Sequence, residues 1–212
     1  MGTGLVLTER DMQILHQVSR FKFCLGRQIR RLASFSGERA CDRRLSRLIE
    51  YSYLERKHIL YGIPGIYFLG KNARHIGSVK YYSYRIKLDE ITHDIAVVDT
   101  VIFLLETLEI SLSDITSERE LHSIDGFSNR KHRPDFVFSQ NEKSFCVEIE
   151  FSQKSKRRLE DILKDNFLEY SAQIWIVPKN EHRIRKIITE SGYPDIRIID
   201  WEVVEKNVRR TK

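Results

Sequence analysis

The sequence predicts a two-part protein in which a small α+β module precedes a second part built on a mixed α/β sheet. Three observations predict this class. Residues 1–87 hold 17 Lys and Arg against 6 Asp and Glu, whereas residues 88–212 hold 19 against 24. Three short helical patterns and two β-prone runs occupy the basic part, and strand and helix patterns alternate in the acidic part. We therefore predict domains at 1–85 and 86–212.

The overall composition limits the class of protein. It is 41% hydrophobic and 31% charged, which is ordinary for a globular protein, and no apolar run is long enough to span a bilayer. The first residues include acids and lack a secretion-signal pattern, so we expect a cytoplasmic protein with no membrane partner. The cysteines, Cys24, Cys41 and Cys146, match no zinc spacing, and we expect reduced, buried thiols.

The first three helices are predicted from a cap and from apolar spacing. Thr8, with Asp11 three residues later, has the pattern of a capping box and begins a helix over residues 8–20. Further helices are expected over residues 25–35 and 38–51. Three short helices in succession are typical of a helix-turn-helix module.

The third of these helices has two different faces. Its apolar residues recur at helical spacing and are expected to face a core. Arginines recur at four-residue steps on another face, namely Arg39, Arg43 and Arg47, with Arg44 beside them. Guanidinium groups suit phosphates and guanine edges in the major groove, which makes this a candidate recognition helix. The alternative is that the arginine row is an ordinary solvated face.

Two β-prone runs, residues 53–61 and 66–69, flank a Gly/Pro turn and predict a hairpin directly after that helix. A hairpin in this position is a wing, so the first part is predicted to be a winged helix-turn-helix that binds double-stranded DNA. The expected DNA-binding residues are Arg39, Arg43, Arg44, Arg47, Arg56 and Lys57, with His58 beside them.

A run of tyrosines over residues 81–84 lies in the connector that follows. Tyrosines can be nucleophiles in DNA strand transfer, but this run lacks the histidine cluster that such chemistry uses, so a packing or linker role is favoured. Residues 88–108 then predict one long helix with a continuous apolar stripe. His93 and Asp94 on that helix are interpreted as a structural pair of a histidine and a carboxylate.

The second part alternates strands and helices. A tight turn at Asn141–Glu142 is expected to join two strands into a hairpin, and the apolar run 172–177 predicts a strand buried on both faces. A basic amphipathic helix is expected to turn Phe167 inward. Residues 114–121 are expected to form a strand or the end of one. Further strands are expected over residues 133–139, 143–151, 172–177 and 195–199, and helices over 156–170 and 181–191.

The hairpin places acidic residues on one face of the predicted sheet. Asp135 on one strand is expected to lie opposite Glu148 and Glu150 on the other. Three carboxylates at a sheet end repel one another unless a cation joins them. Mg²⁺ or Mn²⁺ prefers such oxygen ligands and can activate water for phosphodiester cleavage. The alternative is a set of exposed, solvated acids.

The order Pro134–Asp135, then Glu148-Ile149-Glu150, resembles the PD-(D/E)XK nuclease pattern, which belongs to restriction-endonuclease-like domains. In that family the Asp and Glu bind metal, and a Lys two residues after the Glu assists the attacking water. Here Glu150 stands at the lysine position. Lys154, four residues later, is the basic residue expected to turn back into the site.

The wider layout resembles the plasmid replication-relaxation family, which is similar to the mobilisation relaxases of the Mob C class. The resemblance covers residues 8–177 and rests on the predicted winged helix and on His93–Asp94, Ser117–Glu120, Arg133–Asp135 and Glu148–Leu159. It implies metal-dependent nicking of a plasmid or mobile-element transfer origin without a tyrosine nucleophile.

The resemblance also implies the residues and partners of that activity. The catalytic positions would be Asp135, Glu148, Glu150 and Lys154, and Mg²⁺ or Mn²⁺ would be held by Asp135, Glu148 and Glu118. The implied partners are double-stranded DNA of a transfer or replication origin and other relaxosome proteins. The oligomeric state stays open, with a homodimer among the options.

Two functions remain as hypotheses. The first is a relaxase-type, metal-dependent DNA endonuclease. The second is a non-catalytic winged-helix regulator or replication accessory protein whose nuclease-like domain is degenerate. A fold cannot separate them. The discriminating feature is whether Asp135, Glu148 and a basic nitrogen lie together.

Overall fold

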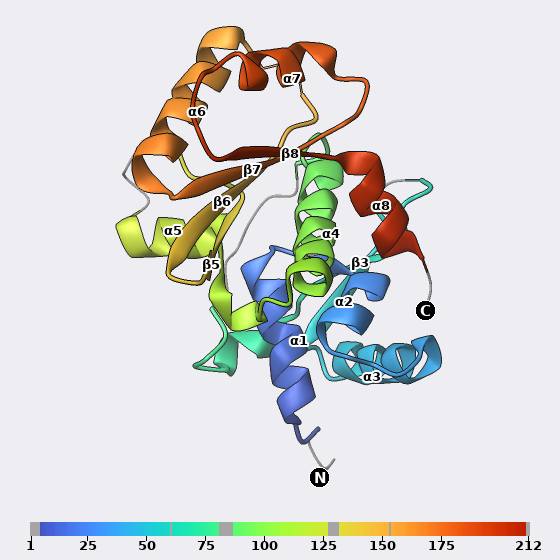
Figure 1. The fold of residues 1–212 in the computed structure, drawn as a ribbon. Coiled ribbons are helices and arrows are strands. Elements are labelled where there is room, and N and C mark those ends of the chain that lie inside the picture. Colours follow the sequence, from blue (N-terminus) through green and yellow to red (C-terminus); the bar gives the residue numbers. More distant parts are fainter. Residues whose placement is uncertain (1–4, 60, 81–86, 127–131, 153, 211–212) are drawn as a thin grey trace. The chain divides into compact units, whose positions relative to one another are not determined.

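The computed structural model shows a mixed α+β protein (Figure 1). The chain divides into two compact units, Met1–Val98 and Asp99–Lys212. The division falls within helix α4 (Ile91–Leu108). The domain boundary expected near residue 85 and the tyrosine run both fall in 81–86, outside the described residues. The structure describes residues 5–59, 61–80, 87–126, 132–152 and 154–210.

Unit 1 combines three helices with a small antiparallel sheet. The sheet has the order β1-β3-β2, and the hairpin β2–β3 follows directly after the third helix. The elements are α1 (Glu9–Arg20), β1 (Cys24–Leu25), α2 (Gly26–Leu32), α3 (Glu38–Glu50), β2 (Leu54–Lys57), β3 (Ile66–Leu69) and the 3₁₀ helix η1 (Lys71–His75).

The cap and the apolar spacing position these helices as predicted. Thr8 Oγ1 accepts a hydrogen bond from Asp11 N at 3.3 Å, and the Asp11 carboxylate accepts one from Thr8 N at 2.6 Å, which is a capping box. Helix α3 buries Cys41, Leu45 and Leu48. Helix α2 is shorter than expected at both ends: Leu25 pairs with β3 in an extra strand, and the helix ends at Leu32, two residues before Ser34 with its positive φ of 50°.

Unit 2 contains a five-stranded mixed sheet of order β4-β5-β6-β7-β8. Strands β4, β5 and β6 are antiparallel, whereas β6, β7 and β8 run parallel to one another. The elements after α4 are η2 (Leu112–Asp114), β4 (Ile115–Ser117), α5 (Glu118–Asp125), β5 (Phe136–Gln140), β6 (Lys143–Ile149), α6 (Lys156–Glu169), β7 (Ala172–Val177), α7 (His182–Thr189), β8 (Ile196–Asp200) and α8 (Trp201–Arg209).

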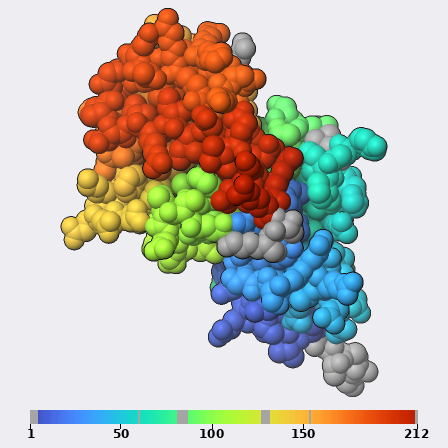
Figure 2. All heavy atoms as spheres, turned by 45° about the vertical axis from the view of Figure 1, so that its right-hand side comes forward, coloured from blue at the N-terminus to red at the C-terminus, as the bar shows by residue number. Residues whose placement is uncertain are grey.

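The strand expected over residues 114–121 is only partly present. Strand β4 ends at Ser117, whose hydroxyl accepts a hydrogen bond from Glu120 N, while the Glu120 carboxylate accepts one from Ser117 N at 2.8 Å. This capping box begins helix α5 and therefore ends the strand. Helix α8 is a further element that the sequence patterns do not predict; it forms part of the surface of unit 2, drawn red in Figure 2.

A two-residue turn joins β5 to β6. Asn141 and Glu142 have φ angles of 51° and 62°, and positive φ at both central positions is what a type I′ hairpin turn requires. The strands then pair from Gln140 and Lys143 to Phe136 and Val147. The turn therefore sets the register that places the acidic residues of the two strands.

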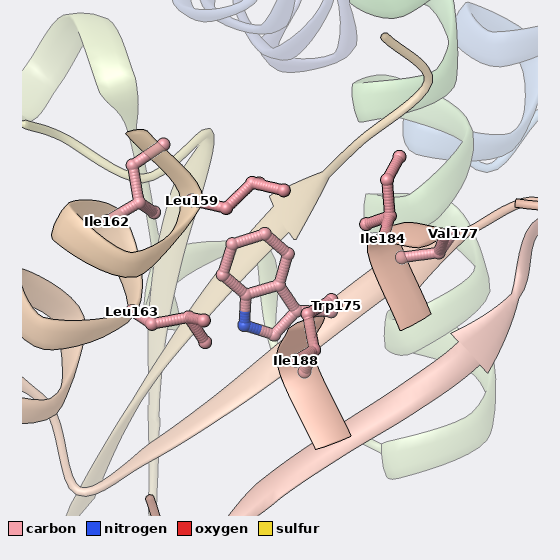
Figure 3. Packing of buried hydrophobic residues seen from close by; sticks show 7 residues of the cluster. All are labelled: Leu159, Ile162, Leu163, Trp175, Val177, Ile184 and Ile188. Carbon is pink, nitrogen blue, oxygen red and sulfur yellow. The ribbon is translucent and has the colours of Figure 1, made fainter. Parts of the chain in front are cut away.

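The core of unit 2 between the sheet and its helices is centred on Trp175. The indole packs against residues of α6 and α7, including Leu159, Leu163 and Ile184 (Figure 3). The strand that bears it, β7, is buried along almost its whole length, as predicted. Phe167 departs from the prediction: it is 42% exposed and lies against Tyr193 rather than inside the core.

The three cysteines are buried free thiols, as the sequence predicted. Burial raises the pKa of Cys41 to about 11 and also raises the pKa of Cys146. Within the part of the chain that the structure describes, no helix has the length and apolar character needed to cross a membrane.

Candidate functional site

Asp135 and Glu148 are neighbours at the end of the β5–β6 hairpin. They stand one step beyond the last paired positions, Phe136 and Val147, so both point to the same face of the sheet. Asp135 Oδ2 also accepts a hydrogen bond from the backbone N of Ile149 at 2.7 Å. The sequence placed these two carboxylates together correctly.

The Glu148 carboxylate is buried, at 4% exposure, and two side chains hold it. Asn166 Nδ2, from helix α6, donates a hydrogen bond to Glu148 Oε1 at 2.8 Å. His132 Nε2 lies 2.6 Å from the same oxygen. Both contacts use Oε1, and no described residue makes a hydrogen bond to Oε2. The carboxylate is therefore fixed in orientation with one oxygen left for a ligand.

Burial has the largest single effect on the pKa values of Glu148 and His132. Burial raises the pKa of Glu148, and the charge of Asp135 raises it further, against the opposing effects of His132 and Asn166. Burial alone would lower the pKa of His132, but its hydrogen bond to Glu148 and the charge of that carboxylate raise it overall. The pair therefore binds its shared proton more tightly than the isolated side chains would.

Glu150 is neutralised locally. It is 2% exposed, and its Oε2 lies 2.5 Å from Lys154 Nζ. Its Oε1 accepts hydrogen bonds from the backbone N and hydroxyl of Ser152, at 3.0 and 2.8 Å. Lys154 precedes helix α6 and turns back to the strand end, as the sequence suggested. The interpretation of Glu148 and Glu150 as solvated acids is wrong, because both are buried and paired.

The two acid–base pairs belong to one cluster. The charge of Lys154 lowers the pKa of His132 and the charge of Asp135 raises it. Lys154, Asp135 and His132 therefore lie close enough to interact electrostatically. A cluster of buried carboxylates with a histidine and a lysine is a feature of sites that move protons or bind cations.

Glu118 contacts Asp135 through its backbone. Its N donates a hydrogen bond to Asp135 O at 2.9 Å, whereas its carboxylate lies 3.7 Å from His122 Nε2. Over the described ranges, no three His, Cys, Asp or Glu side chains are arranged to hold a metal ion. Asp135 and Glu148 thus form a pair of candidate ligands, with no third carboxylate beside them among the described residues.

Sequence reasoning missed His132 and Asn166. A signal for Asn166 was present: it follows Leu159, Ile162 and Leu163 at helical spacing, so a polar residue occupies an inward position of α6. No comparable sequence signal marked His132, apart from its closeness to Asp135 in the chain. Its neighbour Arg133 anchors the segment through an ion pair with Asp125 at 2.7 Å.

Unit 1 presents the predicted arginine row on the outer face of α3. Arg39, Arg43 and Arg47 are exposed. Arg47 also lies 3.7 Å from Glu50 and over the Tyr51 ring. These side chains are available to a polyanion.

Arg44 has a different position from its neighbours in the row. Its Nε donates to Asp11 Oδ1 at 2.5 Å, and its Nη2 contacts Asp11 Oδ2, so it connects α3 to α1. Burial alone would raise the pKa of Asp11, but the hydrogen bonds from Arg44 and Thr8 lower it overall. Arg44 is therefore a structural residue first, and any contact with DNA would be additional.

The hairpin residues Arg56 and Lys57 are exposed on β2. The Arg56 guanidinium lies 5.6 Å from the centre of the Tyr67 ring, and the Lys57 ammonium lies 5.5 Å from that of Phe68. Lys57 also forms an ion pair with Glu55 at 3.1 Å. The aromatic rings hold both cations along the hairpin.

The other acid–base pair noted in the sequence is structural in its contacts. His93 Nδ1 lies 3.7 Å from Asp94 Oδ1, which also receives a hydrogen bond from Lys22 Nζ at 3.0 Å. Asp94 therefore joins the start of α4 to the segment after α1.

Comparison with protein-family models and with curated proteins found no match to this chain.

Proposed function

We propose that the chain binds duplex DNA through a winged helix-turn-helix in unit 1 and nicks that DNA at a metal-assisted, PD-(D/E)XK-like site in unit 2. The observation that supports this most is that the half-buried Asp135 and the buried Glu148 lie together beside His132 and Lys154. By the resemblance to the plasmid replication-relaxation family, the proposed target is the transfer or replication origin of a mobile element.

The order of elements in unit 1 supports the DNA-binding half of the proposal. Three short helices precede an antiparallel hairpin, and the third helix exposes Arg39, Arg43 and Arg47 on the side away from its buried residues. A recognition helix with exposed arginines and a basic hairpin next to it suits the major groove and the adjacent backbone.

The topology of unit 2 supports the nuclease half. An antiparallel hairpin is followed by helix α6 and by the parallel strand β7, and the acidic residues stand at the end of β6 next to α6. Helix α6 supplies Asn166 to Glu148, so the helix that covers the sheet also orients the acid.

The donor set fits Mg²⁺ or Mn²⁺ that is shared with a substrate phosphate. Magnesium is commonly bound by one or two carboxylates together with substrate phosphates, and Asp135 and Glu148 provide two. When bound there, the ion would lower the pKa of a water molecule and stabilise charge on the phosphate. Lys154 would orient that water by donating a hydrogen bond to it, and Glu150 would keep Lys154 in place.

The test is conversion of supercoiled plasmid carrying a transfer origin to the open circle in the presence of Mn²⁺. Asp135→Asn and Glu148→Gln are expected to reduce nicking by about 100-fold or more while the circular dichroism spectrum is kept, since several kcal/mol of transition-state stabilisation would disappear. Glu142→Gln, an exposed acid at the hairpin turn, is the matched control and should nick normally.

Metal binding is measured separately from cleavage. Mn²⁺ should raise the melting temperature of the wild-type protein but not that of Asp135→Asn, because only a ligand that binds the native state stabilises it. Lys154→Ala should keep the shift in melting temperature but nick more slowly. Full nicking by Asp135→Asn would place the active site elsewhere.

A second candidate function is a DNA-binding regulator or replication accessory protein without cleavage. It is favoured by the fact that each acid of the cluster already has a protein partner: Ile149 N for Asp135, His132 and Asn166 for Glu148, and Lys154 for Glu150. DNA binding with neither a Mn²⁺ shift nor nicking of any supercoiled substrate would establish this candidate over the first.

The DNA-binding half has its own expected result. Arg43→Ala with Arg47→Ala should weaken duplex binding and lower the slope of log K against log salt by about one for each phosphate that the variant no longer neutralises. Fluorescence anisotropy over a range of salt concentrations measures both. Arg74→Ala, an exposed arginine of η1, is the control. Unchanged binding by the double variant would mean that the row is only a solvated face.

A further inference from the structure

An open groove of about 760 Å³ lies in unit 1 between the first turn of α1 and the outer face of α3. Four arginines line it: Arg10 from α1, and Arg43, Arg44 and Arg47 from α3. This volume is within the range of small-ligand sites. Arg10 is not among the residues that the sequence suggests for DNA binding.

The groove is net positive. Among the described residues that line it, two are acids, Glu9 and Asp11. Asp11 is fully buried and its charge is matched by Arg44. Within the described part of the chain, neither Arg10 nor Arg43 takes part in an ion pair. Arg10 and Arg43 therefore line the groove without a carboxylate counter-ion among the described residues.

Arg10 is held in place without losing its donors. Its guanidinium lies 4.8 Å from the centre of the Phe35 ring, which also lines the groove. Stacking on an aromatic face restricts the side chain and leaves the N–H groups at the edge of the guanidinium available. A planar set of donors of this kind matches the oxygens of a phosphate.

We propose that this groove binds a backbone phosphate of the DNA that α3 contacts, with Arg10 and Arg43 as its ligands. The inference rests on the proposed DNA binding and extends that interface from α3 to α1. Arg10 would then fix the position of the strand without reading its sequence, because phosphate contacts set register and base contacts set specificity.

The experiment compares Arg10→Ala with Arg74→Ala in duplex binding by the full chain, measured by anisotropy from low to moderate salt. Arg10→Ala should lower affinity by about tenfold at ~0.1 M salt and reduce the salt slope by about one, equally for origin and unrelated duplexes. Arg74→Ala should bind as the wild type does. Arg10→Lys should recover part of the affinity, since it keeps the charge but not the planar donors.

The outcomes separate this inference from the function it rests on. Normal binding by Arg10→Ala, with loss of binding by the Arg43→Ala, Arg47→Ala variant, would refute the groove and leave the recognition helix intact. Failure of the wild-type chain to bind duplex DNA would refute both. A saturable rise in melting temperature with deoxyadenosine monophosphate or inorganic phosphate, absent in Arg10→Ala, would instead make the groove a site for a free nucleotide or phosphate.

Discussion

Replacing Arg44 by alanine is expected to lower the free energy of unfolding of unit 1 by about 1.5–3 kcal/mol, because it removes the charged hydrogen bonds that hold the Asp11 carboxylate. The carboxylate of Asp11 is 0% exposed, and Arg44 is the only cation among the described residues that forms an ion pair with it. Urea denaturation followed by far-ultraviolet circular dichroism measures the decrease. Tryptophan fluorescence reports on unit 2 separately, since both tryptophans, Trp175 and Trp201, lie there.

The neighbouring residue provides the control. Arg43→Ala removes the same charge from the same helix, but Arg43 is exposed, so the free energy of unfolding should change by no more than about 0.5 kcal/mol. The two variants are expected to differ in the opposite sense for DNA binding, where Arg43 matters more. Equal small decreases in stability would show that Asp11 does not depend on Arg44.

The same pair should give the stability of unit 1 a defined pH dependence. The pKa of Asp11 in the folded protein is lowered from its ordinary value of 3.8. Its contribution to stability is therefore complete above that ordinary value and is lost as the pH falls through the lower, folded-state value. The difference in unfolding free energy between the wild type and Arg44→Ala should shrink over this acidic range.

Trp175→Ala is expected to lower the free energy of unfolding of unit 2 by about 3–5 kcal/mol, because it opens a large cavity in the core. The indole is fully buried among residues of α6 and α7 (Figure 3). Its Nε1 donates a hydrogen bond to Gln173 Oε1 at 3.1 Å, and Gln173 Nε2 donates to Leu163 O at 3.0 Å. The substitution also leaves a buried acceptor unpaired.

Trp201→Ala is the matched control for this variant. Trp201, the first residue of α8, is only partly buried and packs against Phe151. Its removal should therefore lower the free energy of unfolding less than the removal of Trp175. Each variant keeps one tryptophan as a fluorescent reporter of unit 2. A decrease for Trp175→Ala no larger than that for Trp201→Ala would mean that the Trp175 cluster is not the main core.

The elements with strong local signals were predictable from the sequence. Helices α1 and α3, the hairpin β5–β6 and strand β7 have clear apolar periods, a cap or a turn, and the structure confirms them. Strand β1 is two residues long and exists only because it pairs with β3, so no local pattern could show it. Helix α5 could have been predicted, since Ser117 and Glu120 have the spacing of a capping box.

Some residues of the candidate site were predictable from the sequence and others were not. Asp135, Glu148 and Lys154 come from one stretch around the hairpin. The closeness of Asp135 and Glu148 follows from strand pairing, and Lys154 contacts Glu150 four residues before it in the chain. His132 and Asn166 meet Glu148 through tertiary packing, which spacing does not encode. Arg43 and Arg44 are equivalent in a pattern of charges, and only the burial of Asp11 distinguishes their roles.

The type I′ turn at Asn141–Glu142 fixes which residues of β5 and β6 pair, and this limits the insertions that the hairpin can accept during evolution. Successive side chains of a strand point to opposite faces, so one extra residue absorbed into β5 or β6 would move Glu148 to the face away from Asp135. The interval of 12 residues between these two acids is therefore as much a part of the site as the acids themselves. A single-codon insertion in either strand of this hairpin would separate Glu148 from Asp135 while every residue of the site remained unchanged.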